Sequence, residues 1–234
     1  MHPTDFPQDF LDRLVQRRGR VHGFEAIESR KTALVVVDMQ NCFCAAGAAG
    51  EVPLAKELVP NINLLARETR AAGGVVAWVQ SALYKKEDWP VFLDTLVKPE
   101  VADHFVSDLM PGGEGHKLWP SLEPETNDLF VTKNRFSAFL PSACNLPQVL
   151  RERSIDTVLI TGTLTNVCSE SSARDAAMSD FKTIMISDGN ATRTDEDHLA
   201  TLRTFIAVFG DVRTSAETVA LLRAGRPKML SAAE

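Results

Sequence analysis

The cysteine at position 168 has the local sequence of a nucleophile. It lies in the segment TGTLTNVCSE (161–170), which joins an apolar run at 157–160 to a helical pattern that begins near Asn166. A cysteine at the start of a helix meets unpaired backbone N–H groups and the positive end of the helix dipole. We therefore expect the Cys168 thiol to ionise more readily than a free cysteine, and the same N–H groups to bind an oxyanion. The alternative is a buried cysteine with a packing role only.

Two further reactive side chains follow predicted strands, at the place where Cys168 also lies. Asp38 comes directly after the apolar run 33–37, and Lys133 follows the run 129–132. Ligands of open α/β sheets bind beyond the carboxyl ends of the strands. An acid, a base and a thiol at that edge are suited to nucleophilic catalysis. A turn or helix cap at Asp38 and a surface charge at Lys133 remain the alternatives.

Strands and helices alternate along the chain, which predicts a doubly wound sheet. The predicted strands are 33–37, 75–79, 129–132, 156–161, 183–186 and 211–213. The predicted helices are 53–71 with a kink at Pro60, 145–153, 166–179, 195–208 and 215–224. We expect a single α/β domain with a six-stranded, mainly parallel sheet and helices on both faces. Residues 81–126 are irregular, and short helices there would form a lid or a pocket wall.

An amphipathic helix is predicted ahead of the sheet, within residues 5–20. Its apolar residues recur at helical spacing and are Phe6, Phe10, Leu11, Leu14 and Val15. We expect this helix to pack on the body of the protein or on a second subunit. The predicted organisation is a helical lead-in segment at 1–30 and the main domain at 31–234.

Composition and charge exclude several classes of partner. A hydrophobic content of 44% and a charged content of 24% over 234 residues are typical of a globular protein. The net charge of −6 argues against nucleic acid and anionic membranes. No apolar run is long enough to span a membrane and no secretion signal is recognisable, so we expect a cytoplasmic protein. The spacing of Cys42, Cys44, Cys144 and Cys168 suits neither a disulfide scaffold nor a zinc site.

Three motifs in this order resemble those of the isochorismatase-like cysteine hydrolases. They are VVDMQN at 36–41, TKNRFSAF at 132–139 and TGTLTNVC at 161–168. The likeness spans roughly residues 30–225 and is greatest to the ureidoacrylate and N-carbamoylsarcosine amidohydrolase branch.

The resemblance implies a six-stranded parallel sheet and a catalytic triad of Asp38, Lys133 and Cys168. It also implies a cis peptide bond between Thr163 and Leu164, which would direct the N–H of Leu164 at the oxyanion together with that of Cys168. A homo-oligomer, either a dimer or a tetramer, is implied as well. Relatives often have a hydrophobic residue and an alanine where this chain has Thr163 and Leu164, so the larger side chain would narrow the pocket.

The implied activity is that of a cysteine-dependent amidohydrolase, which releases ammonia from a small amide or N-carbamoyl (ureido) compound. Asp38 would take the thiol proton, Lys133 would stabilise the pair, and the Cys168 thiolate would attack the carbonyl to give a thioester or S-carbamoyl enzyme. One alternative is vinyl-ether hydrolysis of the isochorismatase type, against which Cys168 argues because true isochorismatases lack that cysteine. The other is a catalytically idle member of the fold that serves in binding or assembly.

Residues beside the motifs are the candidates for substrate contacts, although each of them would also fit an ordinary core position. They are Asn41, Phe43, Gln80, Arg135, Phe136 and Ser137. Arg135 is the nearest candidate to bind a carboxylate, with a structural salt bridge as its alternative. Nicotinamidases of this superfamily bind a metal through an Asp and two histidines after the second strand. Here residues 80–84 read QSALY, so we expect no catalytic metal and no cofactor.

Overall fold

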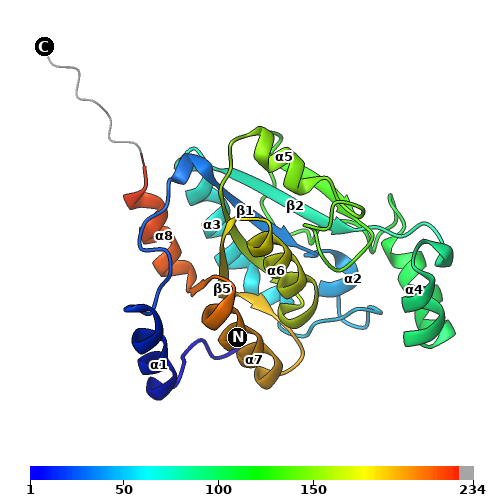
Figure 1. Ribbon diagram of the computed structural model, residues 1–234. Coiled ribbons are helices and arrows are strands. Elements are labelled where there is room, and N and C mark those ends of the chain that lie inside the picture. Colours follow the sequence, from blue (N-terminus) through cyan, green and yellow to red (C-terminus); the bar gives the residue numbers. More distant parts are fainter. Residues whose placement is uncertain (227–234) are drawn as a thin grey trace, which may run out of the picture.

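A six-stranded parallel sheet forms the centre of the protein, as Figure 1 shows for a computed structural model that describes residues 1–226. The strand order is β3-β2-β1-β4-β5-β6, with every neighbouring pair parallel. The strands are β1 (Thr32–Val37), β2 (Val75–Ser81), β3 (Leu129–Lys133), β4 (Thr157–Thr163), β5 (Lys182–Ala191) and β6 (Asp211–Arg213). The predicted six-stranded doubly wound α/β fold is confirmed.

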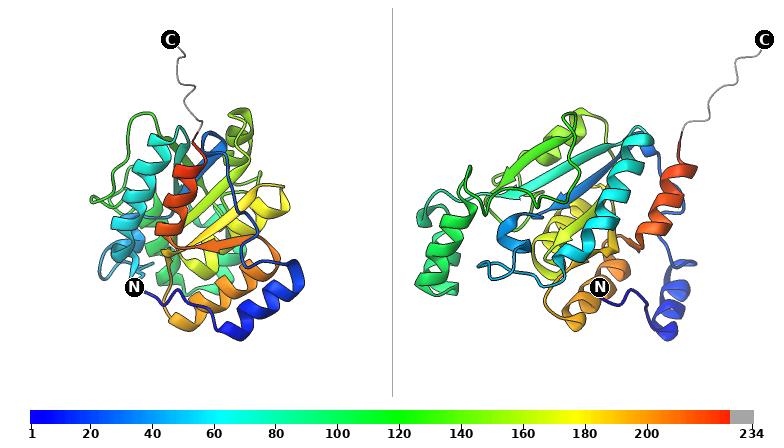
Figure 2. Two further views of the ribbon diagram at one scale, coloured as in Figure 1. Left: turned by 90° about the vertical axis from the view of Figure 1, so that its left-hand side faces the viewer. Right: turned by 180° about the vertical axis from the view of Figure 1, so that it is seen from behind.

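Helices cover both faces of this sheet (Figure 2). The helices of the described residues are α1 (Gln8–Arg18), α2 (Asn41–Cys44), α3 (Val59–Ala71), α4 (Pro99–Leu109), α5 (Leu146–Glu152), α6 (Glu170–Met178), α7 (Asp195–Val208) and α8 (Ser215–Ala224), of which α4 lies beyond the ends of the strands. The apolar residues of α3 and α8 belong to one buried cluster. Those of α5, α6 and α7 belong to a second cluster on the opposite face.

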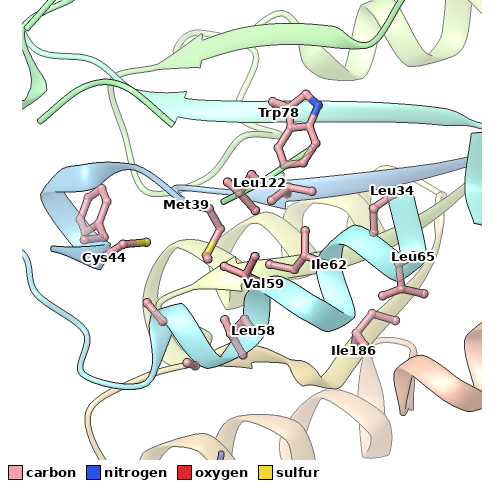
Figure 3. Close-up of a cluster of buried hydrophobic side chains, with 14 of the residues drawn as sticks. Leu34, Met39, Cys44, Leu58, Val59, Ile62, Leu65, Trp78, Leu122 and Ile186 are labelled. Atoms are coloured by element: carbon pink, nitrogen blue, oxygen red, sulfur yellow. The ribbon is translucent and has the colours of Figure 1, made fainter. Parts of the chain in front are cut away.

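Strand β1 shows why the central strands read as continuous apolar runs. Leu34 and Val36 pack into the cluster beneath α3, whereas Val35 and Val37 pack into the opposite cluster. Successive side chains of a strand point to opposite faces, so a strand covered on both sides must be apolar at every position. Figure 3 shows Leu34 with the side chains of α3 that cover it.

The lead-in helix α1 packs against its own chain. Phe10 and Leu14 are buried in the same cluster as the apolar residues of α7. The guanidinium carbon of Arg203, which lies on α7, is 5.2 Å from the centre of the Phe10 ring. The sequence predicts that this helix packs on the body of the protein or on a second subunit. In the structure it packs on the body of the protein.

Two predicted helices differ in their boundaries. A 3-10 turn at Ala55–Leu58 comes first, and α3 begins only at Val59, so Pro60 lies in the first turn of α3. A proline is tolerated there because the missing N–H would have no partner in the helix, and the predicted kink at Pro60 was wrong. The helix predicted at 166–179 divides into a π-helical turn, Thr165–Ser169, followed by α6.

A close approach between β1 and β4 requires glycine at position 162. Gly162 has φ +113, and a Cβ there would come within 2.0 Å of the Val37 carbonyl oxygen. Because any larger residue would separate the strands, this glycine fixes β4 beside the end of β1, where Asp38 and Cys168 must meet.

In the part of the chain that the structure describes, no helix combines the length and the apolar character needed to cross a bilayer.

Candidate active site

Asp38 and Lys133 form a buried ion pair at the carboxyl edge of the sheet. The Lys133 Nζ lies 2.7 Å from Asp38 Oδ2, and both side chains are 0% exposed. Asp38 follows β1 with φ 53, a left-handed conformation that Asp tolerates better than most residues, and its N–H donates to the Val79 carbonyl at 2.9 Å. Lys133 is the last residue of β3. The two side chains therefore reach toward each other across the end of the intervening strand, β2.

Ser81, at the end of β2, joins these two charged groups and was missed by sequence analysis. The Lys133 Nζ donates to Ser81 Oγ at 2.7 Å, and Ser81 Oγ in turn donates to Asp38 Oδ1 at 2.9 Å. Ser81 is the register partner of Lys133 in the β2–β3 pair. The sequence signal was its place at a strand end, but only the strand order shows that β2 lies between β1 and β3.

Backbone carbonyls and an amide side chain hold this constellation in place. The Lys133 Nζ also donates to the Arg135 carbonyl at 3.1 Å, so the three protons of its ammonium have three acceptors. Gln40, two residues after Asp38, accepts from the Ser81 N–H at 2.8 Å and donates to the Ser81 carbonyl at 3.0 Å. The chain end of β2 is thereby fixed next to the ion pair.

Cys168 lies in the π-helical turn after β4 and is 5% exposed. Burial raises the pKa of its thiol above the ordinary value; the charge of Lys133 opposes this rise and that of Asp38 adds to it. The expectation that Cys168 ionises readily is therefore wrong for the free protein, because burial outweighs the helix terminus and the ammonium. The carboxylate whose charge acts on this thiol is that of Asp38.

The ammonium of Lys133 stays charged in this environment. Burial alone would lower the pKa of Lys133, but the charges of Asp38 and Cys168 raise it by more. A raised thiol pKa does not by itself distinguish Cys168, since burial also raises the pKa of Cys42 and of Cys44 to about 12. The charges of Lys133 and Asp38 also act on Cys144, and what distinguishes Cys168 is that it lines a cavity together with Lys133.

A cavity of about 380 Å³ opens onto Lys133 and Cys168. Among the candidates for substrate contacts, Phe43, Arg135 and Phe136 line it. Most of its remaining wall comes from the irregular region after β2, in which the sequence pattern identified no individual residue. The wall residues from that region are Ala82, Leu83, Trp89, Phe92, Val97, Val101, Phe105 and Leu109.

The other three candidates do not line this cavity, because their side chains bind nearby backbone instead. Asn41 donates to the Glu114 carbonyl at 2.9 Å, and Gln80 donates to the His116 carbonyl at 2.8 Å. Ser137 Oγ accepts from the N–H of Phe139 at 3.0 Å. Proximity in sequence to a motif placed them near the site but did not fix the direction of their side chains.

Arg135 lines the cavity without an ion pair. Its guanidinium donates to the carbonyls of Asp88, at 3.0 Å, and Asn134, at 2.6 Å, and it lies 5.0 Å from the centre of the Trp89 ring. Within residues 1–226 it forms no salt bridge. Its structural role is therefore not the salt bridge expected as the alternative to carboxylate binding. Arg135 binds carbonyls and an aromatic face, and so fixes the wall segment onto the end of β3.

Behind the nucleophile turn, Thr165 contacts a buried histidine. Its Oγ1 lies 2.9 Å from His198 Nδ1, and the His198 ring stacks on that of His2 with centroids 4.6 Å apart. His2 Nδ1 is 2.6 Å from Asp195 Oδ1. Burial, and next the neighbouring His2, lower the pKa of His198 from 6.5 to about 4.

This buried histidine is expected to make the fold acid-sensitive. The unfolded chain takes up a proton at His198 near pH 6.5, whereas the folded chain does so only near pH 4, so the stability is present above pH 6.5 and is lost as pH falls toward 4. The free energy of unfolding should fall by about 3 kcal/mol over that range. Urea titrations at several pH values would measure it. The His198→Gln variant should not show this decrease in the free energy of unfolding, whereas a variant at an exposed histidine, His104→Gln, should show it. An equal dependence of the free energy of unfolding on pH in the two variants would contradict the prediction.

Replacing Ser81 by Ala is expected to lower the free energy of unfolding by about 1–3 kcal/mol, because Asp38 and Lys133 would each lose a buried hydrogen-bond partner. Urea unfolding would measure this loss. Ser107→Ala, at an exposed position of α4, is the matched control and should stay within about 0.5 kcal/mol. Equal stability of the two variants would show that the hydroxyl is dispensable to the pair.

Comparison with known proteins gives the family. A family model described as the isochorismatase domain matches residues 32–217. An uncharacterized isochorismatase family protein, YwoC of Bacillus subtilis, is 32% identical over 197 residues, which cover 82% of this chain and 94% of the relative. Ureidoacrylate amidohydrolase RutB of Variovorax paradoxus is 32% identical over 180 residues, which cover 70% of this chain and 69% of the relative.

Solved structures of two hydrolases resemble this fold as well. A cysteine hydrolase from Pseudomonas syringae pv. phaseolicola has a TM-score of 0.79 at 29% identity, over 86% of this chain and 97% of that one. N-carbamoylsarcosine amidase from Thermoplasma acidophilum has a TM-score of 0.64 at 26% identity, over 79% of this chain and 96% of that one.

Fold and site together place a buried acid, an ammonium and a thiol at one end of a parallel sheet in a doubly wound α/β domain. The chain belongs to the isochorismatase family. Within residues 1–226, no three His, Cys, Asp or Glu side chains are grouped closely enough to hold a metal ion.

Proposed function

We propose that this protein is a cysteine-dependent amidohydrolase. It would cleave a C–N bond of an amide or N-carbamoyl compound and release ammonia through a thioester or S-carbamoyl enzyme. The observation that carries the proposal is the buried Asp38–Lys133 ion pair, whose charges both act on the Cys168 thiol at the wall of a cavity. The names of relatives, a ureidoacrylate amidohydrolase and an N-carbamoylsarcosine amidase, support the same reaction class.

The reaction begins with the thiol, because its raised pKa leaves it protonated at neutral pH. Asp38 takes the proton and Lys133 stabilises the thiolate, which attacks the carbonyl carbon. The carbonyl oxygen becomes an oxyanion, and we assign the backbone N–H groups of Leu164 and Cys168 as its donors. Leu164 lines the same cavity as Cys168, and the Thr163–Leu164 peptide bond is cis.

Collapse of this intermediate breaks the C–N bond. The protonated Asp38 gives its proton to the leaving nitrogen, which departs as ammonia, and the acyl group stays on the Cys168 sulfur. Asp38 then accepts a proton from water, and the hydroxide formed attacks the thioester. The acid product leaves and the sulfur recovers a proton, which restores the starting site.

Ammonia release from a panel of amides and ureido compounds tests the proposal, with the parent protein compared with Cys168→Ala and Cys144→Ala. Cys144 is buried like Cys168 but does not line the cavity, so it is the matched control. We expect release by the parent and by Cys144→Ala, none by Cys168→Ala, and an acyl adduct on Cys168 in mass spectra of quenched reactions. Release that survives Cys168→Ala would overturn the mechanism. Hydrolysis of a vinyl ether without Cys168 would favour the isochorismatase-type reaction instead.

The homo-oligomer, the cytoplasmic location and the division at residue 30 stay predictions. Phe10 and Leu14 of α1, which were part of the sequence support for a second subunit, are buried within the chain itself, whereas Val15 is 44% exposed. Sedimentation equilibrium of the purified chain would measure the oligomeric state directly.

A further inference from the structure

The cavity wall that faces the nucleophile is a connected aromatic cluster. The rings of Trp89 and Phe136 are 4.6 Å apart between centroids and lie edge to face at 65°. Phe92 lies 5.4 Å from Phe136 at 81° and 6.4 Å from Phe105. All four rings line the cavity. Such edge-to-face packing holds each ring in one orientation, so the wall is a preformed apolar surface.

The surface that the nucleophile turn presents to the cavity is apolar as well. Leu164, just before the turn, and Val167, within it, line the cavity together with Phe43. Among the described residues, no Asp or Glu side chain lines it. A cationic substrate would therefore find no counter-charge in contact with it.

The cations of the inner cavity are already bound to other groups. The three ammonium protons of Lys133 have Asp38, Ser81 and the Arg135 carbonyl as acceptors. The Arg135 guanidinium donates to two carbonyls through Nη1 and lies over the Trp89 ring. Arg193 also lines the cavity, but it is an exposed residue and so lies at the rim. A carboxylate placed deep in the cavity would lose its water and would compete with these wall contacts for the two inner cations.

We infer, resting on the proposed function, that the substrate is a primary amide or urea whose other substituent is uncharged, apolar and of the size of a phenyl ring or a branched alkyl chain. A cavity of about 380 Å³ accommodates such a group and the reacting carbonyl. The aromatic cluster holds the apolar group, while Cys168 and the adjacent N–H groups meet the carbonyl. Selectivity in this site comes from the residues of the wall and not from a charged anchor.

Two matched pairs of compounds test the inference, because each exchanges an isopropyl group for a carboxylate. The amide pair is 4-methylpentanamide and succinamate, and the urea pair is isobutylurea and N-carbamoylglycine. We expect kcat/KM for ammonia release to be at least about tenfold higher for the apolar member of the pair that reacts, and highest for phenylacetamide. Higher kcat/KM for the carboxylates would overturn the inference, and its loss in Arg193→Gln would identify the rim as the charged anchor.

Variants of the wall give the second readout. Phe92→Ala is expected to lower kcat/KM for phenylacetamide by about 10- to 100-fold, because the variant removes one ring of the cluster. Leu96→Ala is the matched control, since Leu96 belongs to the same π-helical turn (Val91–Leu96) but is 69% exposed and does not line the cavity. Thermal unfolding of both variants shows whether either has lost its fold. Equal kcat/KM in the two folded variants would count against the aromatic wall as the binding surface.

Binding to the Cys168→Ala protein separates this inference from the proposed function. Calorimetry should find tighter binding of phenylacetamide and 4-methylpentanamide than of succinamate, whether or not the parent hydrolyses them. Binding without hydrolysis would keep the substrate class and overturn the proposed chemistry. Hydrolysis of the carboxylates that requires Cys168 would keep the chemistry and overturn the substrate class. If neither of the two apolar amides binds, the inferred substrate class is also overturned.

Discussion

Replacing Asp38 by Asn is expected to lower kcat/KM for ammonia release by at least about 1000-fold. Asn has the same shape as Asp but cannot take the thiol proton, and burial holds the Cys168 thiol in its protonated form. The residual activity should rise with pH, because hydroxide then replaces the missing base. Steady-state rates measured across pH, together with the acyl adduct observed by mass spectrometry, would measure both effects.

Asp180→Asn is the matched control for this variant. Asp180 has φ 63, the same left-handed conformation as Asp38, and it is exposed and distant in sequence from the three motifs. Its replacement changes the same functional group on the same type of backbone and should leave kcat/KM unchanged. Retention of kcat/KM within tenfold in Asp38→Asn would exclude Asp38 as the general base.

Replacing Lys133 by Met is expected to cost about 3–5 kcal/mol of the free energy of unfolding and to abolish activity. The Asp38 carboxylate would then stay buried at 0% exposure with no counter-charge, and the nucleophile would lose the ammonium that stabilises its thiolate. Urea unfolding would measure the stability. In the double variant with Asp38→Asn, part of the stability should return because the uncompensated charge is gone, while activity should not.

A second lysine provides the control for this variant. Lys182 lies at the start of β5, 3.7 Å from Asp156, but its side chain is 44% exposed. Lys182→Met should cost less than about 1 kcal/mol, since water solvates both charges of an exposed pair. A loss in Lys133→Met no larger than that in the control would mean that water reaches the Asp38 carboxylate when the ammonium is removed.

The strands and the site edge could be predicted from the sequence because one physical constraint fixes both. A central parallel strand must be apolar on both faces, so runs such as 33–37 stand out, and the residue after each run falls at the same sheet edge. Asp38 and Lys133 were found in this way. Ser81 was not, because its contact with both depends on β2 lying between β1 and β3, and alternation along the chain does not give strand order.

Properties that depend on surroundings in three dimensions could not be predicted. The helix-terminus argument gave the wrong direction for the pKa of Cys168, because it did not include the burial of the thiol. The side chains of Asn41 and Gln80 turn to loop carbonyls whose position no local pattern specifies. The aromatic wall comes from residues such as Trp89 and Phe92, in a region without helical or strand periodicity, where ring–ring contacts and not propensity determine the conformation.

The lysine of the site is carried by β3, which is an edge strand bonded to β2 alone. Edge strands open locally at lower free energy than central ones, and their amide hydrogens exchange sooner. The ion pair with Asp38 ties the end of this strand to β1 at the centre of the sheet. Fraying of β3 would carry the ammonium away from the sulfur, so the proposed mechanism predicts that a partly opened molecule is inactive. Because Lys133 belongs to this strand, the ion pair and the site are complete only while β3 stays paired with β2.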